Sequence, residues 1–181
     1  MIQTGALFDT SGQYRYSLWR LWNEAAPKVG FVMLNPNLAD ATLDDPTIRR
    51  CLGFARSWGY GALEVVNLFA YRTAHPKELR QVADPIGADN DRTLQTLHQR
   101  VDQIILAWGN WGALHQRHQT AIALLNCQTP YCLGFTKMGQ PRHPLYLKAT
   151  LQPIEFTGLQ SENNQVIRAS DSGTENGRVI P

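Results

Sequence analysis

Amides, carboxylates and arginines are concentrated in the stretch from Phe31 to Arg50, FVMLNPNLADATLDDPTIRR. Carboxylates and amides can orient or activate a water molecule, and arginines can bind phosphate. The candidates for handling water are Asn35, Asp40 and Asp44. Polar loops that follow buried strands often carry the functional groups of α/β proteins. We therefore take this loop as the first candidate site.

Other residues of the same stretch have ordinary explanations beside functional ones. Asp45 precedes a proline, so it can serve simply as a helix N-cap. Arg49 and Arg50 lie near the start of the same expected helix, where they could bind phosphate or face solvent. Pro36 ends the preceding strand, because proline has no N–H to donate to a sheet. The Asn35–Pro36 pair could be a turn alone or part of the site.

Two later segments add candidates for binding and proton transfer. Asn67 ends an apolar segment, and an amide that both donates and accepts suits a nucleobase edge or a neighbouring loop. Phe69 and Tyr71 could stack against a base or join a small core cluster. His143, with Arg142 before it, could protonate or hydrogen-bond a leaving group.

Four short apolar segments separated by helical patterns predict the strands of a parallel sheet. In chain order they are Phe31–Asn35, Ala62–Asn67, Gln103–Trp108 and Tyr131–Gly134. The helical patterns cover residues 46–58, 90–101 and 113–126. We predict a three-layer α/β/α fold with a four-stranded parallel sheet of order 2-1-3-4, plus an N-terminal β-hairpin from residues 5–8 and 14–19. Parallel strands joined by right-handed crossovers end at one edge. Asn35, Asn67 and Gly109 should therefore meet there, beside the His143 loop.

Composition bounds the class of protein. The 181 residues fit one α/β domain, placed at residues 1–157, and the polar residues 158–181 are expected to be a disordered tail. The net charge of +2 is too small to indicate tight binding of duplex nucleic acid. Three cysteines in apolar surroundings indicate buried thiols. No membrane-length apolar run and no dinucleotide, P-loop or hydrolase motif occurs. We expect a cytoplasmic monomer without cofactor, metal or membrane.

Several motifs carry a resemblance to known families. LNPNLADATLDDPTIRRC, VVNLFAYR, DPIGADND, AWGNWG and PRHPLYL resemble the uncharacterised bacterial and phage family catalogued as domain of unknown function 1643, over about residues 5 to 150. More distantly, the order of strand-end motifs is similar to the uracil-DNA glycosylase superfamily. That similarity implies the same fold, with a water-positioning first strand end, a base-reading asparagine, a Trp-Gly pair and a His-Pro loop. The matching positions here are Asn35–Pro36, Asn67, Trp108–Gly109 and His143–Pro144.

Three functions remain open. The leading prediction is hydrolysis of an N-glycosidic bond in a nucleic acid or nucleotide, with water held at Asn35 and the leaving base bonded by His143. The first alternative is a non-catalytic module that binds a nucleobase, a nucleotide or single-stranded nucleic acid. Met33 in place of the superfamily's usual glycine, and a shortened His-Pro loop, favour this alternative. The second alternative is metal-dependent phosphoester hydrolysis through Asp40, Asp44 and Asp45.

Overall fold

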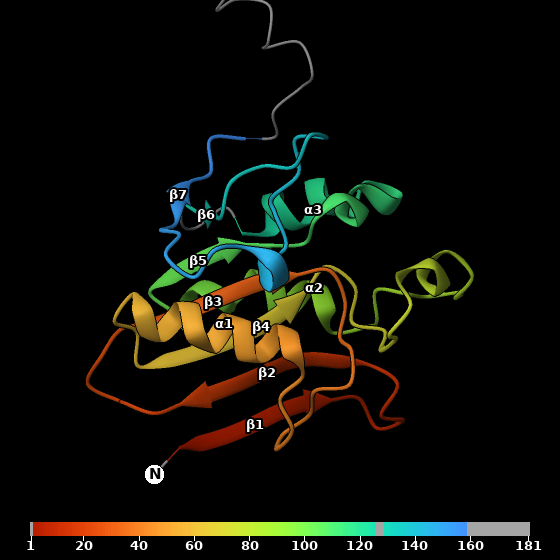
Figure 1. Ribbon diagram of the computed structural model, residues 1–181. Coiled ribbons are helices and arrows are strands. Elements are labelled where there is room, and N and C mark those ends of the chain that lie inside the picture. The colour runs from red at the N-terminus through yellow and green to blue at the C-terminus, as the bar shows by residue number, and fades with distance from the viewer. Residues whose placement is uncertain (1, 126–128, 159–181) are drawn as a thin grey trace, which may run out of the picture.

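The computed structural model describes residues 2–125 and 129–158 of the chain (Figure 1). The predicted tail, apart from Gly158, and Cys127 therefore lie outside the described residues. The described chain forms a seven-stranded sheet in the order β1-β2-β4-β3-β5-β6-β7. The strands are β1 Gln3–Phe8, β2 Arg15–Leu21, β3 Lys28–Met33, β4 Ala62–Asn67, β5 Gln103–Leu106, β6 Tyr131–Cys132 and β7 Ile154–Glu155.

The centre of the sheet is parallel. β3 lies between β4 and β5, β5 pairs with β6, and all three pairings are parallel. The order β4-β3-β5-β6 is the order 2-1-3-4 predicted for the four apolar segments. These strands carry continuous apolar side chains because both of their faces are covered.

The prediction of a four-stranded sheet is corrected at both edges. The N-terminal hairpin does not stand alongside the sheet, because β2 pairs antiparallel with β4 through Leu18–Leu21 and extends it. β7 pairs antiparallel with β6 at the other edge. The sheet is therefore mixed, and added strands cover the edges of β4 and β6, which would otherwise expose unpaired backbone groups.

Two of the three predicted helices are shorter than expected. α1 Pro46–Ser57 matches its pattern, whereas α2 covers only Asn90–Gln95 and α3 only Arg117–Leu124. The residues before α3 form a 3₁₀ segment, Asn110–Gln116, which is separated from it because His115 and Gln116 have φ of 51° and 55°. Left-handed backbone interrupts a helix that the apolar spacing alone would have continued. The remaining 3₁₀ segments are η1 Pro76–Arg80, η2 Leu97–Gln99 and η4 Pro144–Tyr146.

The helices cover both faces of the sheet, which gives the predicted three layers (Figure 1). On one face α1 buries Ile48, Cys51 and Phe54 against alternate residues of β3, including Phe31. On the other face α2 and α3 pack Leu94 and Ala121 against residues such as Val32, one position along. Within residues 2–125 and 129–158, no helix has the length and apolar character needed to cross a membrane.

Candidate functional site

The carboxyl ends of β3, β4 and β5 lie at one edge of the sheet, here called the rim, where the loop of residues 34–45 leads from β3 to α1 (Figure 1). Asn35 stands at the start of this loop. Its side-chain nitrogen donates to the carbonyls of Thr73 at 2.8 Å and Pro36 at 3.0 Å. The Thr73 N–H donates to the Pro36 carbonyl at 3.0 Å. Asn35 and the buried Pro36 therefore join the loop after β3 to the chain after β4, and the Asn35 amide oxygen is the atom that could hold a water or ligand.

Asp40 shapes this loop from within. Its Oδ1 accepts hydrogen bonds from the backbone N–H groups of Leu43 and Thr42, both at 2.8 Å, and from the Thr42 hydroxyl at 3.1 Å. These bonds, that from Leu43 foremost, hold the pKa of the Asp40 carboxyl below its usual range. A carboxylate with a low pKa is a poor proton acceptor. The contacts of Asp40 thus support a role in loop structure rather than in activating water.

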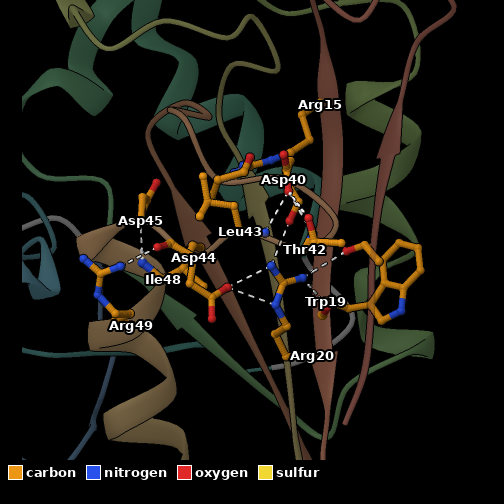
Figure 2. A network of polar contacts seen from close by, with 12 residues as sticks. Arg15, Trp19, Arg20, Asp40, Thr42, Leu43, Asp44, Asp45, Ile48 and Arg49 are labelled. Carbon is orange, nitrogen blue, oxygen red and sulfur yellow. Dashed lines mark hydrogen bonds and ion pairs between the residues drawn. The ribbon is translucent and has the colours of Figure 1, made fainter.

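Asp44 is paired with a buried arginine of β2, as Figure 2 shows. Arg20 Nη2 and Nε lie 2.8 and 3.0 Å from Asp44 Oδ1. The same guanidinium donates to the carbonyls of Asp40 and Trp19, both at 2.8 Å. The Arg20 side chain is only 3% exposed, so the pair fixes the loop against the sheet. The contacts of Asp44, like those of Asp40, therefore support a role in holding the loop in place.

The start of α1 uses the third carboxylate of the loop. Asp45 Oδ1 accepts from the Ile48 N–H at 2.8 Å, the N-cap that the sequence indicates. Arg49 is exposed on the first turn and donates to the Asp44 carbonyl at 2.5 Å. Arg49 can therefore contact a ligand at the rim, whereas Asp45 is partly committed to the helix.

A β-bulge brings a second arginine to the same face of the sheet. Arg15 and Arg20 are five residues apart, which would place them on opposite faces of a regular strand. The register between β1 and β2 shifts where Leu7 pairs with Ser17 and Phe8 with Arg15. The extra residue in β2 reverses the alternation. Both arginines consequently reach the loop of residues 34–45 (Figure 2).

Arg15 is a buried cation without a carboxylate partner. Its exposed fraction is 2%, and its Nη1 donates to the Ala39 carbonyl at 2.5 Å. Its Nε has no hydrogen-bond partner, and no carboxylate of the described residues lies within 4.0 Å. Burial lowers the pKa of Arg15 to about 10, against the opposing charge of Asp45. A buried cation that forms no ion pair within 4.0 Å among the described residues is unfavourable, so binding of an anion would stabilise Arg15.

An open hollow of about 590 Å³ lies between the β1–β2 turn and the loop of residues 34–45. Arg15 does not line it, but Arg15 bonds the same loop through the Ala39 carbonyl. The residues that line the hollow are Phe8, Asp9, Thr10, Ser11, Gly12, Asp40, Ala41, Thr42 and Arg72. The guanidinium of Arg72 lies 4.9 Å from the Phe8 ring centroid and donates to the Gly12 carbonyl at 2.9 Å. The Nε of Arg72 is also buried and unpartnered among the described residues. The charge of Arg72 adds to the lowering of the Arg15 pKa by burial.

His143 lies across the rim, next to the end of β5. A Cβ built on Gly109 would lie 3.7 Å from the His143 Cβ, and Gly109 has a φ of 71°. The Leu145 N–H donates to His143 Nδ1 at 3.3 Å, so the ring hydrogen is placed on Nε2. Burial lowers the pKa of His143, with Asp45 opposing. His143 is thus a neutral imidazole that can donate one hydrogen bond, and Arg142 beside it is exposed.

Three residues predicted to bind a base are buried in the core. Phe69 and Trp108 are enclosed, and Trp108 Nε1 donates to Gln140 at 2.9 Å. A base cannot stack on the enclosed Phe69 ring, which corrects the prediction of stacking there, and the Trp108 ring is closed to a ligand as well. Asn67 is 1% exposed, but its amide nitrogen has no partner among the described residues. Tyr71 is half-buried and packs edge-on against another tyrosine.

The ends of β3, β4 and β5 bring Asn35, Asn67 and Gly109 to the rim, with His143 next to Gly109. The rim also has residues that the sequence analysis did not select. These are Arg15, Arg20 and Tyr146. The two arginines of β2 stand at the ends of the segment RYSLWR, and arginines at both ends of a largely apolar strand are the signal that could have indicated them. Tyr146 gave no signal, because only its exposure distinguishes it.

Comparison with known protein families matches residues 15–145 to the family described as "Protein of unknown function (DUF1643)". The chain belongs to this family. The match covers β2 to β6 and the rim residues from Arg15 to His143, and it ends before Tyr146. No curated protein and no solved structure matches the chain, so the more distant resemblance to uracil-DNA glycosylases receives no support from either comparison.

Proposed function

We propose that this DUF1643 protein binds a nucleotide at the rim without cleaving it, with the phosphate against Arg15 and Arg72. The buried guanidinium of Arg15 carries this proposal. A cation that is 2% exposed and lacks a carboxylate within reach is stabilised when an anion binds. Arginine suits phosphate because its planar donors match phosphate oxygens.

The other groups at the rim suit the organic part of a nucleotide. His143 offers a neutral N–H donor, and Asn35 offers an amide oxygen. The charge of Asp45 opposes the lowering of the pKa of both Arg15 and His143, which supports placing the two side chains in one neighbourhood. A ligand with a phosphate and a hydrogen-bonding base could use both.

The carboxylates favour binding over cleavage. Hydrolysis of an N-glycosidic bond needs a held water whose oxygen joins the sugar carbon while the base departs and takes a proton. Asp40 and Asp44 are the predicted bases for that water, and both are engaged by hydrogen bonds or an ion pair. The same engagement weakens the proposal of a metal ion at these aspartates, and the described residues contain no cluster of His, Cys, Asp or Glu suited to a metal.

Thermal unfolding with a panel of ligands tests the proposal. Nucleoside 5′-phosphates at 100 times their Kd should stabilise the protein by about 2.7 kcal/mol, or roughly 5–10 °C in Tm. The matching nucleosides should stabilise it less, and Arg15→Met should abolish the phosphate-dependent difference. Arg56→Ala, at the far end of α1, is the matched control. No shift with any nucleotide, or an unchanged shift in Arg15→Met, would overturn the proposal.

N-glycosidic hydrolysis remains the second candidate, and the neutral His143 donor favours it. A donor of this kind can bond a departing base. Chromatography of the same nucleotides after incubation with the protein measures base release directly. Release that falls in His143→Gln would replace the binding-only proposal with this one.

A further inference from the structure

A long segment of the chain that contributes one side of the rim contains no acidic residue. From Gln103 to Ile154 the chain contains no aspartate or glutamate, while Lys137, Arg142 and Lys148 are all exposed. The segment 135–148 that carries these cations follows β6 and lies next to α1, which adds the exposed Arg49. The carboxylate of Asp45 is close enough to act on His143 on this side, and its Oδ1 is used by the N-cap bond to Ile48. The surface therefore has an excess of positive charge.

Tyr146 projects from this cationic surface. It is 92% exposed, although it belongs to the short 3₁₀ segment η4. The residues around it are fixed: Pro144 and Leu147 are buried, and the Leu147 carbonyl accepts a hydrogen bond from Arg50. The Arg50 guanidinium in turn lies 4.7 Å from the Phe54 ring centroid in α1. The backbone thus holds an aromatic ring in solvent instead of letting it fold into the core.

The tip of the neighbouring loop repeats this combination. Phe135 pairs with Pro141, and the Thr136 N–H donates to the Gln140 carbonyl at 2.8 Å, so the loop is a closed turn. Lys137 and Met138 occupy its tip, and Met138 is 59% exposed. Exposed apolar side chains alternating with cations, in a segment without carboxylates, fit a chain of bases and phosphates.

We propose that the surface formed by Lys137, Met138, Arg142, Tyr146 and Lys148 binds single-stranded nucleic acid, with a base stacked on Tyr146 and phosphates on the cations. This inference rests on the proposed function for its class of ligand and extends it from one nucleotide to several. Single strands are favoured over duplex because unstacked bases present their faces to an aromatic ring. The few cations available also match a short strand.

Fluorescence anisotropy with a labelled single-stranded 12-mer tests this surface, with a nucleoside monophosphate titrated in parallel. Stacking on one base is worth about 1–3 kcal/mol, so Tyr146→Ala should weaken 12-mer binding by roughly 5- to 150-fold. Tyr146→Phe should bind like wild type. Arg142→Ala and Lys137→Gln should each reduce the salt slope by about 0.7, as expected for one phosphate contact on a single strand. Arg56→Ala should change neither property.

The two probes separate the two proposals. If the monophosphate binds and Tyr146→Ala leaves the affinity for the 12-mer unchanged, the proposal of this surface is overturned and the proposal of the nucleotide site is not. Binding of the 12-mer that depends on Tyr146, without monophosphate binding, would overturn the nucleotide site and support the surface. Binding of neither probe would overturn both. Ribose and deoxyribose 12-mers of the same sequence distinguish RNA from DNA as the source of the strand.

Discussion

Replacing Arg15 with methionine gives the sharpest test of the rim, because the two interpretations of this residue predict different changes in the free energy of unfolding. If Arg15 serves the fold, its loss should cost as much as the loss of any well-bonded buried group. If Arg15 serves to bind an anion, Arg15→Met should leave the free energy of unfolding of the ligand-free protein almost unchanged, because methionine fills a similar volume without a charge. Unfolding in urea without ligand distinguishes the two.

The expected magnitude follows from the contacts of Arg15. Burial lowers its pKa from 12.5 to about 10, and at about 1.4 kcal/mol per pKa unit the buried charge costs roughly 3 kcal/mol. Its hydrogen bond to the Ala39 carbonyl is worth about 1.5–3 kcal/mol, as for other bonds from charged groups. These terms nearly cancel. Arg15→Met should therefore change the free energy of unfolding by no more than about 1 kcal/mol.

Arg20→Met is a matched control, because Arg20 has the same face, the same strand and nearly the same burial. It differs in having a carboxylate partner, Asp44, and carbonyl acceptors at Asp40 and Trp19. Breaking this buried pair should cost about 2–4 kcal/mol. Equal losses in the two variants, or a loss above about 2 kcal/mol in Arg15→Met, would refute the interpretation of Arg15 as a binding cation.

Three further predictions concern the loops of the rim. Asp44→Ala should lower the free energy of unfolding by about 2–4 kcal/mol, because it leaves Arg20 buried and unpaired. The exposed neighbour variant Arg49→Ala should change it by less than about 0.5 kcal/mol, and urea unfolding measures both values. Burial lowers the pKa of His143, so below pH 6.5 the unfolded chain binds more protons than the folded protein, and the free energy of unfolding should fall as the pH drops below that value. His143→Gln should flatten this dependence of stability on pH. Equal slopes of stability against pH in wild type and variant would contradict the prediction. Gly112→Ala should lower the free energy of unfolding by about 2 kcal/mol or more, because the added Cβ would lie 2.1 Å from the Trp108 ring. A red shift of the tryptophan fluorescence should accompany this loss. Unchanged stability and an unchanged spectrum would show that the ring can move freely.

The sequence determined the centre of this protein because the centre depends on local patterns. Continuous apolar runs identify buried parallel strands whatever surrounds them, and Asp45 before a proline identifies the start of α1. The right-handed crossover then places Asn35, Gly109 and the His143 loop at one edge without further information. The three layers and the order of the parallel strands follow from the same rules.

Only the tertiary structure decided how the side chains at this edge are used. Asp40 and Asp44 look alike in sequence, yet one is held by loop N–H groups and the other by a buried arginine of β2. Phe69 and Trp108 follow strand ends as binding residues would, but the sheet and the helices enclose them. Arg15 reaches the rim because a bulge reverses the alternation of side chains in β2. Tyr146 stays exposed because the Leu147 carbonyl beside it is held by a hydrogen bond from Arg50. Such outcomes depend on contacts between segments far apart in the chain, and the periodicity of residues within one segment does not predict those contacts.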